Sequence, residues 1–137
     1  MKRFLIAAAV MTVAAAPALA NSSTIMQITR TDKTVTGQPI ISPEHPTVIA
    51  TVLTLQPGDR TPEHKHPYPH YGYVLDGTLT VVNTETGKSF ELAKGAFLVE
   101  MMNTAHYGEN RGKQPVSILI IDSVPAGTAT NSVPVKP

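Results

Sequence analysis

The chain has 137 residues, enough for one domain with a single hydrophobic core. Its 11 lysine and arginine residues nearly balance its 10 acidic residues, which argues against a basic surface for nucleic acids or anionic lipids. Because there is no cysteine, disulfide bonds and thiolate metal ligands are excluded.

Residues 1–20 have the pattern of a secretory signal peptide. Lys2-Arg3 precede an apolar run from Phe4 to Ala16, and Ala18-Leu19-Ala20 is a small-residue cleavage site. The run is too short for a membrane anchor. We therefore expect a periplasmic or secreted protein, cleaved after Ala20 and free of the membrane. Its formal net charge becomes −1, because 9 basic side chains remain against 10 acidic ones.

Residues 21–46 are expected to form one strand followed by a loop. Thr24–Arg30 alternates apolar and polar residues, which is typical of an edge strand. Gln38–Pro46 contains three prolines and predicts a loop, in which His45 is exposed to solvent.

Residues 47–123 read as a succession of short strands. Thr47–Leu55 is rich in β-branched residues and predicts a buried strand. Asp76-Gly77 is a signal for a tight hairpin between the strands Tyr71–Leu75 and Thr78–Asn83. Further strands are expected at Lys88–Leu92, Ala96–Met102, Ala105–Glu109 and Val116–Asp122. The absence of a helical period predicts an all-β barrel or sandwich, and residues 124–137, with three prolines, form a C-terminal tail or arm.

Three histidines lie close together between Gly58 and Gly77. His64 and His66 are two residues apart, so in a strand they share one face about 7 Å apart. Pro67-Tyr68-Pro69 then breaks the strand, and the turned chain can bring His70 to the same point. Three neutral imidazoles that converge indicate a metal site.

A second stretch begins at Gly95 and places His106 eleven residues later, with Asn110 four residues beyond. The two stretches resemble the paired motifs of the cupin superfamily, over Thr47 to Asp122. The matching residues are Gly58, His64, His66, Gly77, Gly95, His106 and Asn110. The resemblance implies a cupin jelly-roll β-barrel with inward-pointing histidines.

Three positions depart from the family pattern. His70 stands where the family usually has glutamate, Met101 replaces a proline and Asn103 a glycine. The resemblance implies metal ligands at His64, His66, His70 and His106. Four imidazoles leave a divalent ion with its full +2 charge, which attracts a carboxylate, enolate, phenolate or peroxide.

The expected cofactor is one divalent transition metal ion per chain. Imidazole ligands suit copper, iron, nickel and zinc. The resemblance adds manganese, because manganese sites of this composition occur among small cupins, so copper, iron or manganese is expected, with zinc or nickel as further options. Four protein ligands on an octahedral ion leave two positions for substrate and oxidant, whereas a tetrahedral zinc would be closed and structural.

The lining of the barrel follows from alternation and from the family pattern. His70, Gly72 and Val74 should face inward, and Tyr71, Tyr73 and Leu75 outward. The family pattern places Phe97, Val99 and Met101 inside. The candidate catalytic residues are Tyr68, Glu100 and Tyr107, although packing roles for the tyrosines and a solvated surface role for Glu100 and for Glu63 are the alternatives.

The leading hypothesis is an exported oxidoreductase that activates O2 or peroxide on a small organic or carbohydrate-derived substrate. Dioxygenase-like chemistry and copper-dependent oxidative cleavage are its two versions. The alternatives are a non-redox lyase, decarboxylase or isomerase, and a protein that binds a ligand or metal without turnover. A homodimer is expected, because small cupins commonly pair through their sheets and Tyr71, Tyr73 and Leu75 offer an apolar outer face.

Overall fold

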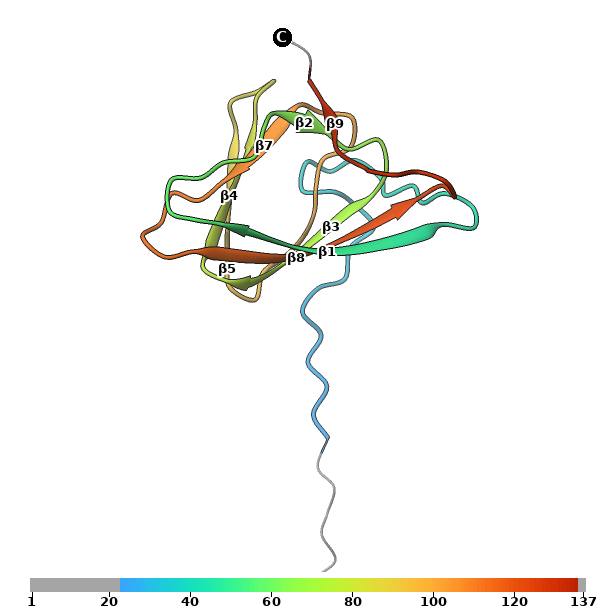
Figure 1. The fold of residues 1–137 in the computed structure, drawn as a ribbon. Coiled ribbons are helices and arrows are strands. Elements are labelled where there is room, and N and C mark those ends of the chain that lie inside the picture. Colours follow the sequence, from blue (N-terminus) through green and yellow to red (C-terminus); the bar gives the residue numbers. More distant parts are fainter. Residues whose placement is uncertain (1–22, 136–137) are drawn as a thin grey trace, which may run out of the picture.

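The computed structural model describes residues 23–135, so the predicted signal peptide lies outside the described residues. Residues 23–135 contain nine β-strands, which form two sheets that face each other (Figure 1). No helix with the length and hydropathy needed to cross a membrane occurs in this part of the chain. The predicted all-β jelly roll is confirmed.

The first sheet has four antiparallel strands in the order β1-β8-β3-β6. These are β1 (Thr47–Leu55), β8 (Val116–Val124), β3 (His70–Asp76) and β6 (Phe97–Val99). Directly opposed residues share a face of the sheet, so the register decides which side chains enter the barrel. Gly72 of β3 lies opposite both Leu98 and Ile120, and His70 lies opposite Asp122.

The second sheet has five strands in the order β5-β4-β7-β2-β9. These are β5 (Ser89–Ala93), β4 (Thr78–Asn83), β7 (His106–Glu109), β2 (His64–Lys65) and β9 (Val133–Pro134). In its register His64 lies directly opposite His106. Two of the predicted ligands are therefore neighbours across adjacent strands.

The hydrophobic core fills the space between the two sheets. It consists of Leu55, Val74, Leu79, Val81, Leu98, Met101, Val116 and Ile118. On β3 the predicted alternation is confirmed, because His70, Gly72 and Val74 are buried while Tyr71 and Tyr73 are only partly buried and Leu75 is exposed. The inward face of β3 therefore carries small and polar residues at one end and core residues at the other.

The predicted hairpin at Asp76-Gly77 is wrong. Strand β3 pairs with β6 and β8, whereas β4 pairs with β5 and β7, so the chain crosses from one sheet to the other at this point. Gly77 has a φ of 77°, and a Cβ there would lie 2.7 Å from the carbonyl oxygen of Pro115. The glycine is thus required by a sheet crossing that brings two backbones together, and not by a two-residue turn.

Two other expectations for the N-terminal half are also wrong. Thr24–Arg30 forms no strand, and Ile25 is 95% exposed because the segment runs away from the barrel (Figure 1). Strand β1 is not buried but forms the free edge of its sheet, where Val48 and Val52 are more than half exposed. Its β-branched residues favour a strand at an edge as well as in a sheet centre.

The C-terminal segment does not behave as a free tail. Strand β8 continues to Val124, and the chain then turns back so that β9 pairs with β2. Asn131, in this returning segment, is only 2% exposed. The segment therefore packs on its own barrel, beside the strand that carries His64.

Candidate metal centre

The three motif histidines come together because β2 and β7 are paired. His64 and His106 are opposed in the register, and His66 follows β2 and bridges to Met102. His66 and His106 have no exposed surface, while His64 is partly exposed. Their ring centroids lie 4.6 to 4.9 Å apart.

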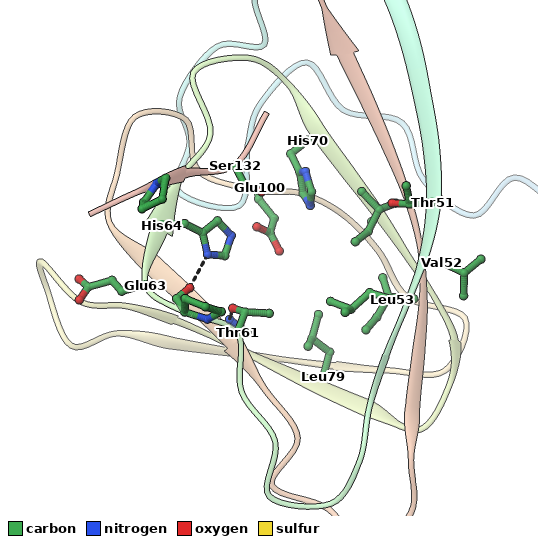
Figure 2. Close-up of a pocket in the computed structure, with 16 residues that line it drawn as sticks. Thr51, Val52, Leu53, Thr61, Glu63, His64, His70, Leu79, Glu100 and Ser132 are labelled. Atoms are coloured by element: carbon green, nitrogen blue, oxygen red, sulfur yellow. Dashed lines mark hydrogen bonds between the residues drawn. The ribbon is translucent and has the colours of Figure 1, made fainter. Parts of the chain in front are cut away.

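Each of these rings is oriented by a backbone carbonyl. The Nδ1–H groups of His64 and His106 donate to the carbonyls of Pro62 and Thr104, at 2.7 and 2.8 Å; the His64 bond is drawn in Figure 2. His66 Nδ1–H donates to the carbonyl of Asn131 at 3.1 Å. Because a carbonyl can only accept, the hydrogen is on Nδ1 and the lone pair of each neutral ring is on Nε2. Fixing one imidazole nitrogen in this way is typical of metal-binding histidines.

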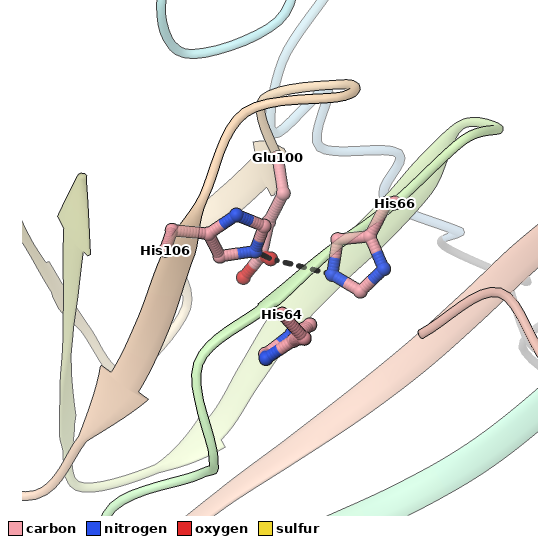
Figure 3. A group of neighbouring side chains, drawn as sticks. All are labelled: His64, His66, Glu100 and His106. Carbon is pink, nitrogen blue, oxygen red and sulfur yellow. Dashed lines mark hydrogen bonds and ion pairs between the residues drawn. The ribbon is translucent and has the colours of Figure 1, made fainter. Parts of the chain in front are cut away.

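A carboxylate completes the group. Glu100 Oε2 lies 2.8 Å from His106 Nε2 and 3.1 Å from His66 Nε2. Glu100 is 8% exposed, so a solvated surface role for it is wrong. One ligand atom from each of His64, His66, Glu100 and His106 lies within 4.8 Å of the others (Figure 3). We call these four residues the metal cluster.

The inward position of Glu100 follows from the register of β6. Leu98 faces Gly72 across the pair, so Leu98 and, two residues later, Glu100 point into the barrel. The expectation that Phe97 and Val99 line the barrel is wrong, because they oppose Tyr73 and Tyr71 on the outer face. Met101 is fully buried in the core, as expected.

The chemistry of the cluster fits a metal ion. Burial, the largest effect, lowers the pKa of His66, so at neutral pH this ring is neutral and its Nε2 has a lone pair. That lone pair faces Glu100 Oε2, 3.1 Å away. The pKa of Glu100 is held well below its usual range: burial acts to raise it, but the hydrogen bond from protonated His106 and the charge of His70 prevail. Two acceptors in contact repel unless a cation lies between them. Three imidazoles and one carboxylate can coordinate a divalent ion that lies between them, and the carboxylate reduces the charge of the site to +1.

His70 belongs to a neighbouring group. Its Nδ1–H donates to Asp122 Oδ1 at 2.7 Å, and its ring stacks on His66 with centroids 3.8 Å apart and planes 7° from parallel. Burial alone would lower the pKa of His70, but the hydrogen bond to Asp122 and the charges of Glu100 and Asp122 raise it. The structure therefore brings His64, His66 and His106 together with Glu100, and it pairs His70 with Asp122. Asp122 was not among the candidates from the sequence, because its place opposite His70 depends on the pairing of β3 with β8.

The C-terminal segment holds these two groups together. Besides the contact of its carbonyl with His66, Asn131 donates from Nδ2 to Asp122 Oδ1 at 2.7 Å. The same side chain accepts from the backbone N–H of Tyr68 and donates to its carbonyl, at 3.1 and 3.0 Å. Sequence reasoning missed Asn131, because nothing in a proline-containing tail marks one asparagine.

A pocket of about 490 Å³ opens onto the cluster (Figure 2). His64, His70 and Glu100 form its polar end, and Leu53, Leu79, Ile118 and Ile120 form apolar walls. Tyr68 and Tyr107 are not among the lining residues. Tyr107 instead packs beneath Arg60, whose guanidinium carbon lies 4.6 Å from the ring centroid. Glu63 lies at the pocket and accepts a hydrogen bond from Thr84.

Metal affinity is expected to fall as the pH drops through the pKa of His106. Burial alone would lower that pKa, but the hydrogen bond and charge of Glu100 raise it above 6.5. A metal ion must displace this proton, so affinity should fall about tenfold per pH unit for each proton displaced. Chelator competition between about pH 5.5 and about pH 8 measures the slope.

The folding stability of the metal-free protein is expected to fall as the pH rises above about 6.5, whereas metal affinity rises over the same range. A raised histidine pKa stabilises the folded state at low pH, and this stabilisation is lost as the pH rises through the folded-state pKa of His106 and His70. The lowered pKa values of His64 and His66 reduce the stability of the folded state only at lower pH, where those rings take up protons on unfolding. Denaturant titrations of metal-free and metal-loaded protein should diverge with rising pH; parallel curves would contradict the assignment.

Comparisons with known proteins agree with this architecture. A family model described as the Cupin domain matches residues 51–122. Polyketide cyclase RemF from Streptomyces resistomycificus has 21% identity and a TM-score of 0.55 over 66% of this chain and 61% of its own. Oxalate decarboxylase from Lactobacillus farciminis has 26% identity and a TM-score of 0.51, over 58% and 25%. Salicylate 1,2-dioxygenase from Pseudoaminobacter salicylatoxidans has 23% identity and a TM-score of 0.50, over 56% and 22%.

The chain spans less than two thirds of the length of each of these three proteins. Their reactions differ, so the likeness concerns the barrel and not a shared activity. No curated protein matches the sequence.

Proposed function

The chain belongs to the cupin superfamily, and we propose that it is a mononuclear-metal enzyme that oxidises a small organic molecule with O2 or peroxide. The observation that carries the proposal is the geometry of the metal cluster at the end of a pocket. Three Nε2 atoms fixed by backbone carbonyls and one buried carboxylate face one point, and His64 and Glu100 also line the pocket.

His64, His66, Glu100 and His106 would hold the ion. A divalent iron, copper or manganese ion held by nitrogen-rich ligands supplies a redox centre and a Lewis acid, and zinc or nickel supplies the Lewis acid. The protein residues have separate tasks. Glu100 brings one negative charge to the centre, the carbonyls of Pro62, Thr104 and Asn131 fix the rings, and the apolar walls restrict water around the substrate.

A second candidate is a lyase, decarboxylase or isomerase without redox chemistry. The observation in its favour is the His70–Asp122 pair, because His70 lines the pocket and its Nδ1 is held by a buried carboxylate. A histidine oriented in this way can accept or deliver a proton through Nε2. Both candidate reactions would use the metal cluster. The oxidation requires O2 or peroxide, whereas the lyase, decarboxylase or isomerase reaction does not.

Metal analysis followed by turnover under air and under argon separates the possibilities. We expect one metal ion per chain, and turnover of small organic acids that consumes O2 or added peroxide. Turnover that is equally fast under argon without peroxide would favour the second candidate. Stoichiometric metal without turnover of any acid would indicate a binding protein, and protein without metal affinity would refute both enzyme proposals.

We propose that the protein acts outside the cytoplasm, which rests on the signal-peptide pattern of residues 1–20. Expression of the full chain in a bacterial host should yield mature protein that starts at residue 21 and is recovered from the periplasm or the medium. Mass spectrometry of the intact protein checks the cleavage site. The matched variant replaces Leu5 by arginine, which interrupts the apolar run and should leave Met1 on a cell-retained chain. Active protein that keeps residues 1–20 in both cases would contradict export.

We propose that two chains pair through the outer face of the first sheet. This face carries Tyr71 and Tyr73 of β3 together with Val48 and Val52 of β1, and the two valines are 63% and 61% exposed. Light scattering of the mature protein should give twice the chain mass. Val52→Lys should shift the equilibrium toward the monomer without loss of metal, since Val52 is at the sheet edge and outside the metal cluster. A monomer mass for the parent at about 100 μM would contradict pairing.

A further inference from the structure

The walls of the pocket differ sharply from its metal end. Leu53 of β1 and Ile118 and Ile120 of β8 line it from the first sheet, and Leu79 of β4 lines it from the second. Gly72 and Gly108 add backbone without side chains. Among the described residues that line the pocket, none is lysine, arginine, tyrosine, phenylalanine or asparagine. The pocket therefore offers few polar partners beyond the metal cluster and His70.

The pocket has two kinds of polar lining residue, those of the metal end and those that are exposed or partly exposed to solvent. His64, His70 and Glu100 belong to the metal end. Thr51 of β1 and Ser132, which precedes β9, are exposed, and Thr61, which precedes β2, is partly exposed. Glu63 is the one charged lining residue away from the cluster within the described chain. A second negative charge on the substrate would meet no lysine or arginine among these lining residues. A chain of hydroxyl groups would lie against Leu53, Leu79, Ile118 and Ile120 and lose its hydrogen bonds to water.

We infer that the substrate is a compact molecule with one anionic or metal-chelating group and an apolar remainder. The anionic group lies at the cluster, which holds a net +1 charge once a divalent ion is bound by Glu100 and three neutral imidazoles. The apolar remainder lies between the two sheets, in a pocket of about 490 Å³, a size suited to a small ligand. The inference rests on the proposed metal-dependent function and narrows it: carbohydrate-derived substrates and dicarboxylates do not suit these walls.

Four simple carboxylates test the inference on metal-loaded protein by calorimetry. Hexanoate should bind more tightly than acetate, by about fourfold for each methylene group that the walls bury. Gluconate and adipate have the same six carbons as hexanoate, but gluconate adds hydroxyls and adipate a second charge. Both should bind at least about tenfold more weakly than hexanoate. Gluconate or adipate binding as tightly as hexanoate would overturn the inference.

A pair of variants on β8 locates the apolar part. Ile120 lines the pocket, and Ile121 faces the other side of the same sheet, opposite Tyr71. Ile120→Phe should reduce hexanoate affinity about tenfold or more and leave acetate affinity unchanged, because acetate does not reach the wall. Ile121→Phe, the matched control, should change neither. Equal effects of the two variants on hexanoate would contradict binding in this pocket.

The metal-free protein distinguishes this inference from the proposed function. With metal removed, 1-hexanol should still bind at least about tenfold more tightly than ethanol, as ligand-observed NMR can measure, because the walls do not depend on the ion. Ile120→Phe should abolish that preference. If metal does not bind but the preference for 1-hexanol persists, the metal-dependent function fails and the apolar pocket stands. If metal binds but no chain-length preference occurs in either form, the substrate inference fails alone.

Discussion

Replacement of Glu100 by glutamine is expected to weaken metal binding about 100-fold or more, whereas His70→Ala should weaken it about tenfold at most. The reason lies in which atoms face the common point. Glu100 Oε2 contacts the Nε2 atoms of His66 and His106, while the Nδ1–H of His70 donates to Asp122. Glutamine keeps the shape but removes the negative charge that lowers the charge of the site from +2 to +1.

Chelator competition with the purified variants measures the two effects. Glu63→Gln is the matched control, since Glu63 also lines the pocket but lies outside the metal cluster, and its affinity should equal that of the parent. His106→Ala should be at least as damaging as Glu100→Gln, because it removes a fully buried ring from the cluster. Loss of metal in His70→Ala with retention in Glu100→Gln would instead support the predicted site of His64, His66, His70 and His106.

The grouping of His64, His66 and His106 depends on the pairing of β2 with β7, but it was predictable because the two stretches match the spacing of a family motif. Two of these residues share a strand face by their spacing, and the third lies in a motif at a fixed distance from a glycine. The substitution of a family glycine by Asn103 is also accommodated locally, since Asn103 has a φ of 54° and asparagine tolerates this conformation better than most residues. The backbone conformation at Asn103, unlike the grouping of the histidines, does not depend on which strands pair.

The role of Glu100 was not predictable in the same way. Strand β6 has only three residues, so its alternation could not be assigned without the pairing of Gly72 with Leu98. A shift of one residue in that register reverses which side chains enter the barrel. The first motif has His70 where the family usually has glutamate. A glutamate, Glu100, nevertheless lies beside His66 and His106, although it comes from a segment 30 residues further along the chain. The crossing at Gly77 was misread for a similar reason, because Asp-Gly has the same local pattern in a hairpin and in a sheet change.

The C-terminal segment shows a further limit of pattern reading. Its two-residue strand β9 has no period to detect, and the contacts of Asn131 join residues that are 63 and 65 positions apart. Asn131 lies beyond the matched family region of residues 51–122. Because Asn131 contacts both His66 and Asp122, the C-terminal segment supports the metal cluster. Removal of this segment should therefore affect both folding and metal binding.

Asn131→Ala is therefore expected to destabilise the metal-free protein by about 3 kcal/mol, which lowers the melting temperature by about 10 °C. The side chain is 2% exposed and makes three hydrogen bonds, and its loss leaves the buried Asp122 oxygen and the backbone N–H of Tyr68 without these partners. A group left unsatisfied inside a protein costs about 1–3 kcal/mol. The backbone carbonyl that holds His66 is retained in alanine but is no longer fixed by the side chain, so metal affinity should fall about tenfold.

The adjacent residue provides the control for Asn131→Ala. Ser132 is exposed and belongs to the same segment, and Ser132→Ala should leave both the melting temperature and the metal affinity close to those of the parent. Asn131→Asp separates hydrogen bonding from packing. It keeps the acceptor for Tyr68 but turns a carboxylate toward Asp122, so at neutral pH it should destabilise the protein at least as much as alanine. If Asn131→Ala behaves like Ser132→Ala in both measurements, the tail does not hold the centre, and the carbonyl of residue 131 orients His66 without help from its own side chain.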